Sequence, residues 1–274
     1  MKAAVFGAGG HIGGRLAARL EAEGWEVLAL GRGDERWRGA ELGHVFFCVG
    51  LTADFRTRPF ETIEAHVGFA GEVLRRAIFD SFLYLSSTRV YAKSGRGAET
   101  TPLVVDPGDP SDLYNLSKLM GEAACLAVDR PQVRIARLSN VYGDDPGSGN
   151  FLAAILREAA GAGAIRLHSA LESEKDYIAL DDVLAAMIRI AVAGSERLYN
   201  LASGVNTSHG AIVGAIRTLT GCSVSVEPGS PAIRFPAIAV ERLRALGVNH
   251  VHSVVDALPA LLAQAKAQLQ TGRR

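Results

Sequence analysis

The sequence has little cysteine, no excess of either charge and no long uninterrupted apolar run. Its three cysteines, at positions 48, 125 and 222, are too few and too scattered for a disulfide framework or a zinc site, so no metal centre is expected. The 29 basic residues equal the 29 acidic residues, which argues against a broad basic surface for nucleic acid or anionic lipid. No apolar run approaches the roughly 20 residues that span a bilayer. We therefore expect a soluble, cytoplasmic protein that binds neither nucleic acid nor membrane.

Strand signals alternate with helix signals along the 274 residues. Short apolar runs predict strands at 3–6, 27–30, 45–49, 82–85, 133–138 and 198–201. Segments compatible with helices begin near Ile12 and lie at 62–77, 113–128, 151–160, 181–193 and 256–270. This alternation predicts βαβ units, and hence an α/β fold with a doubly wound parallel sheet.

A glycine-rich turn follows the first expected strand. Gly7, Gly10 and Gly13 have the spacing of a dinucleotide-binding loop, in which they permit a sharp turn, approach of the backbone to a pyrophosphate, and close packing of helix on sheet. The helix that starts at His11 and Ile12 then offers free N–H groups to phosphate. The alternative is a structural turn, because a chain with 30 glycines produces such spacings by chance.

The second expected strand ends at a position that usually selects the cofactor. An acidic residue there would bind the adenosine ribose of NAD, but this sequence has Arg32. A guanidinium can pair with a 2′-phosphate, which favours NADP and leaves NAD as the alternative. The other interpretation of Arg32 is a solvated loop arginine.

Hydroxyl and amine side chains form a second cluster of candidates. Tyr114 and Lys118 are four residues apart in a helical segment, so they share one face, and a nearby ammonium lowers the pKa of a phenol. Ser86 and Ser87 follow the strand expected at 82–85, where a hydroxyl faces the ligand crevice of a parallel sheet. Each element also has a purely structural interpretation: Tyr114 and Lys118 as a pair on a helix surface, and the serines as a turn that ends a strand.

Together, in this order, the motifs resemble the extended short-chain dehydrogenase/reductase family of NAD(P)-dependent sugar epimerases, dehydratases and reductases. The resemblance rests on the glycine loop, Ser86–Tyr91, Tyr114 with Lys118, Arg137–Gly143, Asp176–Val183 and Tyr199–Leu201, with Cys48–Leu51 at the run beside the cofactor. It implies a dinucleotide-binding domain at 1–143 and 178–203. A smaller C-terminal substrate-binding lobe would comprise 144–177 and 204–274, with the active site between the two.

The resemblance also implies roles for individual residues. Tyr114 would exchange a proton with a carbinol or carbonyl oxygen, Ser87 would hydrogen-bond that oxygen, and Lys118 would tune Tyr114 and hold the nicotinamide ribose. The expected cofactor-binding residues are Gly7, Gly10, His11, Ile12, Gly13, Arg32, Gly50, Tyr114, Lys118 and Leu138. The expected substrate-binding residues are Ser86, Ser87, Asn140, Asn150, Lys175 and Arg234.

The sequence departs from the family pattern at several points. The route from Arg32 to Val45 is too short for the strand and helix that usually lie there, which affects the adenine pocket. His66 stands where the family usually has Asn, and Lys175 replaces an Arg. Arg234 is the nearest candidate for the arginine that often grips a nucleotide diphosphate.

Three functions remain open from the sequence. The first is an NADP-dependent reductase of a nucleotide-activated ketosugar; the second is a nucleotide-sugar epimerase with retained NAD; the third is a non-catalytic NAD(P)-binding sensor. A dehydratase ranks lower, because Thr88 and Arg89 stand where an acidic pair is expected. Family members often dimerise through the helices corresponding to 64–77 and 114–126, so a homodimer is expected.

Overall fold

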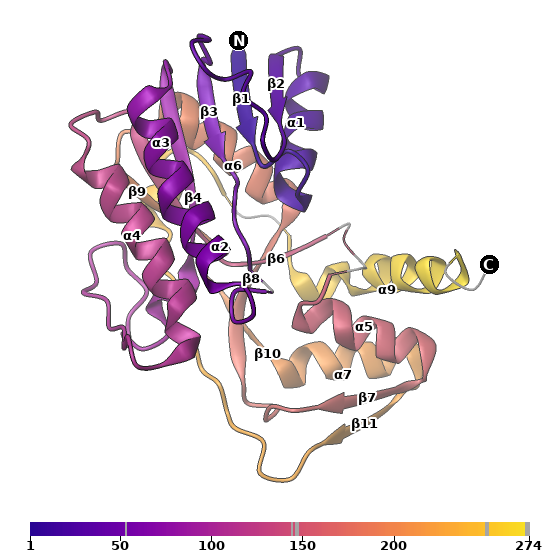
Figure 1. The fold of residues 1–274 in the computed structure, drawn as a ribbon. Helices are drawn as coiled ribbons and strands as arrows, with labels where there is room; N and C mark the ends of the chain where they lie inside the picture. The colour runs from indigo at the N-terminus through magenta and orange to yellow at the C-terminus, as the bar shows by residue number, and fades with distance from the viewer. Residues whose placement is uncertain (53, 144, 146–147, 250–251, 272–274) are drawn as a thin grey trace. The chain divides into compact units, whose positions relative to one another are not determined.

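The computed structural model describes residues 1–52, 54–143, 145, 148–249 and 252–271 (Figure 1). Contacts divide the chain into unit 1, which is Met1–Ser139, Val183–Leu201 and Ala239–Asn249, and unit 2, which is Asn140–Asp182, Ala202–Ile238 and His250–Arg274. Segment 239–249, which the sequence analysis assigned to the lobe, groups with unit 1. The amide of Asn200 donates a hydrogen bond to the Ala239 carbonyl there. The binding roles of the units stay predictions.

Unit 1 is built on a six-stranded sheet. The strands are β1 (Lys2–Phe6), β2 (Glu26–Leu30), β3 (His44–Phe47), β4 (Ser81–Ser87), β5 (Val133–Leu138) and β9 (Leu198–Leu201). They lie in the order β2-β1-β3-β4-β5-β9, and every neighbouring pair is parallel. The parallel sheet predicted from the sequence is confirmed.

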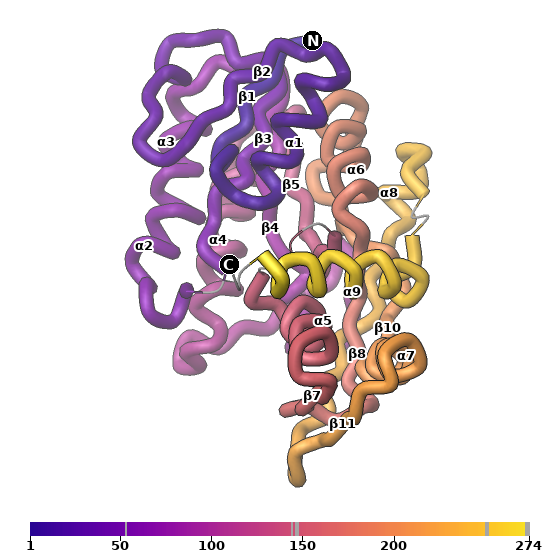
Figure 2. Tube along the Cα trace, turned by 90° about the vertical axis from the view of Figure 1, so that its right-hand side faces the viewer, coloured from indigo at the N-terminus to yellow at the C-terminus, as the bar shows by residue number. Residues whose placement is uncertain are grey.

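Helices cover both faces of this sheet (Figure 2). On one face lie α1 (His11–Ala22) and α6 (Leu180–Ala193). On the other lie α2 (Pro59–Ile63), α3 (Phe69–Arg76) and α4 (Leu113–Ala127). The short helices η2 (Thr88–Tyr91), η3 (Pro110–Asp112) and α8 (Glu241–Ala245) complete the unit. Because the carboxyl ends of parallel strands meet at one edge, residues that follow β1, β3 and β4 gather there.

The helix expected over 62–77 is interrupted by a π-helical turn at Glu64–Gly68. The carboxylate of Glu64 folds over Gly68, where a Cβ would collide with it. The turn includes His66, which is fully buried. Such turns insert a residue into the helix and change which side chains face inward. Hydrophobic spacing alone did not predict this interruption.

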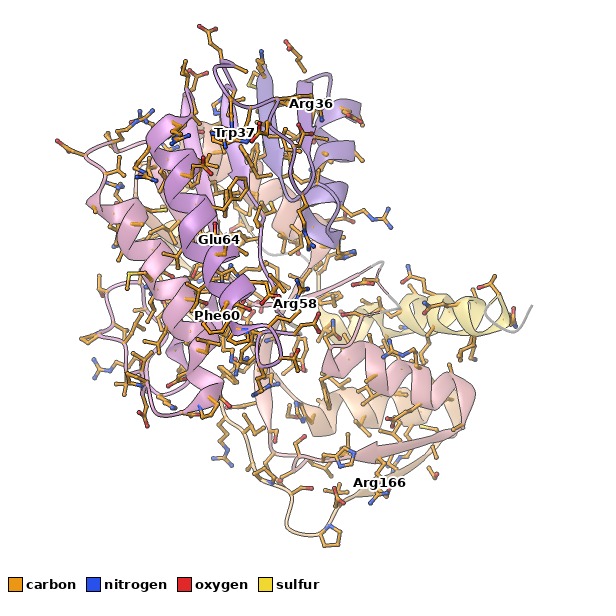
Figure 3. The ribbon with its side chains drawn as sticks, in the orientation of Figure 1. Arg36, Trp37, Arg58, Phe60, Glu64 and Arg166 are labelled. Carbon is orange, nitrogen blue, oxygen red and sulfur yellow. The ribbon has the colours of Figure 1, made fainter. Side chains whose placement is uncertain are left out.

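The connection between β2 and β3 contains neither a strand nor a helix, as its length predicted. Trp37 from this segment is 1% exposed and packs edge-on against Phe6, with ring centres 5.8 Å apart. In the sheet, β2 is therefore an edge strand. The Arg36 side chain lies beside it, and its Nη2 donates to the Ala29 carbonyl oxygen at 2.9 Å (Figure 3).

Unit 2 combines two small sheets with three helices. Its strands are β6 (Asn140–Tyr142), β7 (Ala164–Leu167), β8 (Glu174–Ala179), β10 (Asn206–Ser208) and β11 (Ser223–Val226). They form the sheets β10-β8-β6 and β11-β7. The helices α5 (Phe151–Gly161), α7 (His209–Thr220) and α9 (Val254–Thr271) bury apolar side chains in a common core. None of the described helices has the length and hydropathy needed to cross a bilayer.

Candidate active site

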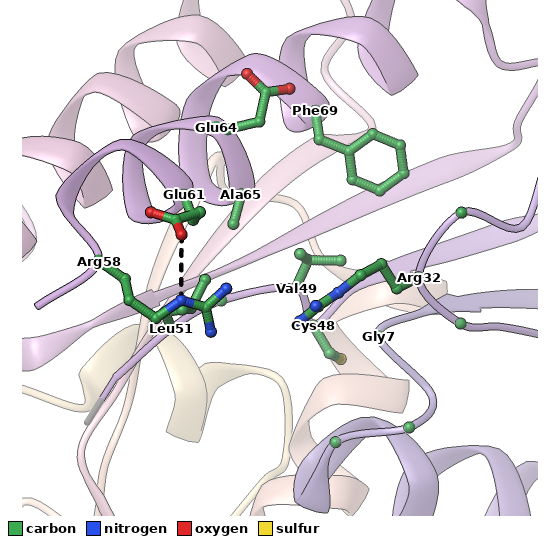
Figure 4. Close-up of a pocket in the computed structure, with 15 residues that line it drawn as sticks. Gly7, Arg32, Cys48, Val49, Leu51, Arg58, Glu61, Glu64, Ala65 and Phe69 are labelled. Atoms are coloured by element: carbon green, nitrogen blue, oxygen red, sulfur yellow. Dashed lines mark hydrogen bonds and ion pairs between the residues drawn. The ribbon is translucent and has the colours of Figure 1, made fainter. Parts of the chain in front are cut away.

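A cavity of about 740 Å³ in unit 1 lies at the carboxyl ends of the strands. It is lined by the glycine loop, the turn after β2, the residues after β3, and the helix that follows (Figure 4). The lining residues are Gly7, Gly9, Gly10, Gly31, Arg32, Gly33, Cys48, Val49, Gly50, Leu51, Arg58, Glu61, Glu64, Ala65 and Phe69. Four of the predicted cofactor residues, Gly7, Gly10, Arg32 and Gly50, are among them.

The glycine loop is shaped by close backbone approaches. Gly7 has a φ of +81°, and a Cβ there would lie 3.0 Å from the Cys48 carbonyl. At Gly13 a Cβ would collide with the Gly7 backbone, so this glycine lets α1 pack against the turn. Gly10 is the N-cap of α1 and carries no capping side chain. A helix N-terminus without a side-chain cap is suited to an anion, and the phosphate-binding role of this loop stays a prediction.

Two arginines enter the cavity from opposite sides (Figure 4). Arg58 pairs with Glu61, with 3.3 Å between Nε and Oε1. Arg32 comes from the turn after β2, and among the described residues no hydrogen bond or ion pair engages it. A charged side chain with no partner in a cavity is suited to an anionic ligand.

The phenol of Tyr114 lies on α4 next to the end of β4. The Tyr114 side chain is buried, and burial raises the pKa of its phenol. A hydrogen bond with the Ser87 side chain and the charge of Arg89 both act to lower that pKa. The Ser87 oxygen also accepts a hydrogen bond from the Arg89 amide at 3.2 Å. The structure thus brings Ser87 and Tyr114 together, as predicted, and adds Arg89.

Lys118, one turn further along α4, is 4% exposed. Its Nζ donates to the Leu85 carbonyl oxygen at 2.9 Å and lies 6.0 Å from the centre of the Tyr114 ring. Burial lowers the pKa of Lys118 to about 7, and the Glu122 carboxylate partly opposes the shift. A Cβ at Gly50 would lie 3.3 Å from Nζ, so Gly50 allows this amine to approach the cavity wall.

His66 completes the wall between Gly50 and α4. Its Nε2 accepts a hydrogen bond from the Leu51 amide at 3.2 Å, and its Nδ1 lies 2.8 Å from Ser117 Oγ. Because the Ser117 hydroxyl donates to the Tyr114 carbonyl, Nδ1 carries the proton and donates to Ser117. Burial lowers the pKa of His66 to about 2, so the ring is neutral. It supports the loop after β3 and the start of α4 without adding charge.

A buried ion pair lies beneath these residues. Arg137 Nη2 and Glu122 Oε2 are 2.6 Å apart, and both side chains are almost fully buried. Ser86 donates to Glu122 Oε1 at 2.5 Å, and Arg137 Nη1 donates to the Tyr91 hydroxyl at 2.7 Å. The hydroxyl of Ser86 is thus engaged inside the protein, and its substrate role stays a prediction. The pair ties α4 to β4 and β5.

The predicted substrate residues of unit 2 are distributed over several elements. Asn140 donates from Nδ2 to the Asp176 carbonyl at 2.9 Å, and Asn150 caps α5 by accepting from the Ala153 amide at 2.9 Å. Lys175 lies on β8, with Nζ 5.9 Å from the Phe235 ring centre. Arg234 is exposed and forms a backbone bridge with Glu174. The substrate-binding roles of these four residues stay predictions.

Three of the expected cofactor-binding residues, His11, Ile12 and Leu138, are not among the cavity-lining residues. Their contacts with the cofactor also stay predictions.

Sequence reasoning missed several residues of the site. Arg58 and Glu61 line the cavity, and their only local signal is a proline after Arg58 that starts α2. Arg89 was noted in the sequence only because it stands where an acidic residue is expected. Glu122 lies four residues after Lys118, a spacing that predicts a shared helix face with the amine.

Comparison with known proteins identifies the family. The family model described as "NAD dependent epimerase/dehydratase family" matches residues 44–202. The chain belongs to this family. The resemblance to extended short-chain dehydrogenases/reductases drawn from the motifs is therefore confirmed.

Individual members of the family are similar to this chain over most of its length. A dTDP-4-dehydrorhamnose reductase of Mycobacterium tuberculosis is 30% identical over 205 residues, which cover 69% of this chain and 66% of that relative, just under two thirds. A UDP-glucose 4-epimerase of Mycolicibacterium smegmatis is 28% identical over 266 residues, covering 79% of this chain and 83% of the relative.

Two solved structures illustrate the similarity of fold along nearly the whole chain. The structure of RMD from Pseudomonas aeruginosa complexed with NADPH has a TM-score of 0.80 at 20% identity, covering 97% of this chain and all of that one. UDP-glucose 4-epimerase with UDP-glucose from Thermotoga maritima has a TM-score of 0.79 at 17% identity, covering 98% and 100%. At these identities the similarity shows the fold.

Proposed function

We propose that this protein is an NADPH-dependent oxidoreductase that reduces a nucleotide-activated ketosugar, with unit 1 binding the dinucleotide and unit 2 binding the substrate. The observation that carries the proposal is the grouping of Ser87, Tyr114 and Lys118 at the end of β4, next to a cavity that begins at a glycine loop. A hydrogen-bonded phenol beside a dinucleotide-type cavity is suited to proton transfer at a carbonyl oxygen.

The groups that line the cavity are suited to a nicotinamide dinucleotide. The approaches at Gly7 and Gly13 leave no room for side chains, and the start of α1 offers amides to a pyrophosphate. Arg32, without a partner among the described residues, is suited to a 2′-phosphate, which supports NADP over NAD. Lys118 is positioned by the Leu85 carbonyl and would bind the ribose hydroxyls.

The protein's own residues supply the proton chemistry. Tyr114 would donate its phenolic proton to the carbonyl oxygen of the substrate, and Ser87 would hydrogen-bond the same oxygen. The phenolate that remains is stabilised by the positive charge of Arg89. When bound, the reduced nicotinamide supplies the hydride that the carbonyl carbon accepts.

The relatives support a sugar nucleotide as the substrate. Several similar proteins bear the name dTDP-4-dehydrorhamnose reductase, which describes reduction of a nucleotide-linked ketosugar. Asn140, Asn150, Lys175 and Arg234 of unit 2 are proposed to contact it. A second candidate is a nucleotide-sugar epimerase with retained NAD, which the similarity to a UDP-glucose 4-epimerase over 79% of the chain favours.

We also propose a cytoplasmic homodimer formed through the helices over 64–77 and 114–126, which include α3 and α4. Met120 on α4 is 59% accessible, and Phe60 on the adjoining helix α2 is 81% accessible. Figure 3 labels Phe60. Burying such side chains is favourable, and an apolar helical face is typical of a dimer interface. Sedimentation analysis of the protein and of Met120→Glu tests this: a dimer that the glutamate weakens supports the interface, and a monomeric wild-type protein contradicts it.

The reductase proposal is tested by following oxidation of NADPH or NADH with a panel of nucleotide-linked 4-ketosugars. We expect stoichiometric NADPH consumption with one or more of them. Tyr114→Phe should lower kcat on the order of a hundred- to ten-thousand-fold, the contribution typical of a positioned acid, while cofactor affinity changes little. Tyr177→Phe is the matched control, because its hydroxyl is buried in unit 2 and has no partner among the described residues.

Each result separates the candidate functions. Interconversion of sugar nucleotides without net cofactor oxidation, and with NAD released on denaturation, would favour the epimerase. Cofactor binding with no reaction on any carbonyl would favour the sensor that the sequence left open. Turnover that survives Tyr114→Phe would contradict the role of this tyrosine.

A further inference from the structure

Two arginines lie against one aromatic ring next to the proposed proton donor. The guanidinium carbons of Arg56 and Arg89 lie 4.6 Å and 5.1 Å from the centre of the Phe55 ring. The Phe55 and Tyr114 rings are 5.6 Å apart, and the guanidinium carbon of Arg89 lies 5.5 Å from the Tyr114 ring. All these residues belong to unit 1.

Both guanidinium groups are fixed by one residue of η3. Arg56 Nη2 donates to Ser111 Oγ at 3.0 Å, and Arg89 Nη2 donates to the Ser111 carbonyl oxygen at 3.2 Å. Phe55 is 2% exposed, so the ring that both cations contact is itself held in the protein interior. The arrangement is thus anchored by hydrogen bonds and packing.

Neither arginine is neutralised by the part of the chain that the structure describes. No carboxylate among those residues forms an ion pair with Arg56 or Arg89, and no protein acceptor there takes a hydrogen bond from Arg89 Nε or Nη1. The carboxylates whose charges act on the pKa of Arg89 are Asp109 and Asp112, and both form ion pairs with Lys93. Burial and the charge of Arg56 lower the pKa of Arg89, because both disfavour its charged form. An anion bound next to Arg89 would stabilise that charge.

The position restricts which anion can fill this site. Guanidinium groups bind carboxylates and phosphates through paired N–H donors. Because Arg89 lies against the ring of Tyr114, the anionic group must be carried near the carbon whose oxygen receives the proton. In a hexose that reacts at C4, the substituent at C5 is next to that carbon, whereas the nucleotide diphosphate is attached at C1, across the ring.

We propose that Arg89, supported by Arg56, binds a carboxylate on the sugar, so that the preferred substrate is a uronic-acid-type sugar nucleotide. The inference rests on the proposed function for the position of the reacting carbon. It makes Arg89 a specificity-determining residue, at a position where the sequence analysis noted only that an expected acidic pair is missing.

Calorimetric titration of the NADP-loaded protein tests the inference by binding. The probes are UDP-glucuronate and UDP-glucose, which differ in charge at C6, and the nucleotide-free set of glucuronate, glucose and glucose 6-phosphate. We expect the carboxylate of each set to bind roughly 10- to 100-fold tighter than its neutral counterpart, as a charged hydrogen-bonded pair allows. Arg89→Met should abolish this preference, Arg89→Lys should restore part of it, and Arg56→Met should reduce it less.

Arg166→Met is the matched control, because Arg166 is an exposed arginine of unit 2 that pairs with Glu227. It should leave the preference unchanged. An Arg89 with a merely structural role would weaken the acidic and neutral probes equally, and thermal unfolding of each variant separates that result from misfolding. If Arg89→Met does not fold, the comparison of Arg89→Lys with the wild-type protein still measures the preference.

Several outcomes would overturn the inference. They are equal affinity of the wild-type protein for acidic and neutral probes, a preference that survives in Arg89→Met, tighter binding of glucose 6-phosphate than of glucuronate, and no binding of any probe. Turnover of neutral ketosugars without a carboxylate preference would leave the proposed function standing and remove the inference. A carboxylate preference in binding without hydride transfer to any sugar would remove the proposed function and keep the anion site.

Discussion

The Nζ atom of Lys118 lies 2.9 Å from the carbonyl oxygen of Leu85. This hydrogen bond fixes the amine at the end of β4, in a place where burial lowers its pKa to about 7. The protein therefore holds a lysine whose pKa lies in the physiological range.

The stability of the protein should reflect this lysine. A Lys whose pKa is lower in the folded state than its ordinary 10.5 binds more protons when unfolded, so stability rises with pH between about 7 and 10.5. Relative to Lys118→Met, the wild-type protein should gain free energy of unfolding across this window, by at most about 1.4 kcal/mol per pH unit. Below pH 7 the difference should level off.

Urea unfolding of both proteins at several pH values measures the difference. Lys266→Met serves as the control, because Lys266 is exposed on α9 and its loss should not reproduce the profile. A difference between the wild-type protein and Lys118→Met that stays constant from pH 7 to 10 would show that the amine remains charged in the folded state.

Cofactor choice should depend on Arg32. Replacing it with Ser removes the cation proposed to bind the 2′-phosphate, so kcat/KM with NADPH should fall roughly 10- to 100-fold, while the value with NADH changes little. Steady-state kinetics with both cofactors measures the ratio. Arg36→Ser is the matched control, since Arg36 lies in the same loop but pairs with Asp34 and does not line the cavity. An unchanged NADPH to NADH ratio in Arg32→Ser would contradict the assignment.

The packing of α4 against the sheet should be sensitive at Gly121. A Cβ there would collide with the Tyr84 hydroxyl and lie 2.7 Å from the His66 carbonyl oxygen. Gly121→Ala should therefore destabilise the protein by about 1–3 kcal/mol, the usual cost of overpacking. Gly71→Ala in α3 meets open space and should be stabilising by about 0.5–1 kcal/mol, because alanine favours the helix. Thermal or urea unfolding of the pair measures both signs, and equal behaviour would refute the packing argument.

The buried pair of Glu122 and Arg137 should be costly to break from one side. Glu122→Gln keeps the shape but leaves the Arg137 guanidinium buried without a counter-charge, which typically costs about 3–5 kcal/mol. Glu72→Gln, which removes a surface partner of Arg38, should cost less than about 1 kcal/mol. Urea unfolding compares the two. A small effect at Glu122 would indicate that water or another group compensates the arginine.

The parallel sheet could be predicted because its strands are short, apolar and bounded by turn residues, as in Ala3–Phe6 before Gly7. The grouping of Ser87 with Tyr114 could be predicted as well, since strand order brings the end of β4 next to α4. The π-helical turn around His66 could not, because helical spacing does not encode it, and the hydrogen bond of His66 with Ser117 joins residues 51 positions apart. Arg58 and Arg89 were missed because the three-dimensional path of the chain at the start of α2 and in η2 determines where their side chains reach.

The edge of the sheet at β2 has a consequence for association between molecules. An exposed edge strand offers free carbonyl and amide groups to which a strand from another chain can add, and this is a common route to aggregation. The guanidinium of Arg36 already occupies the Ala29 carbonyl, and its charge would have to be displaced by an incoming strand. A loop arginine thus hinders edge-to-edge pairing on the side where the usual outer strand of the fold is missing, so that β2 can be the last strand of the sheet without promoting aggregation.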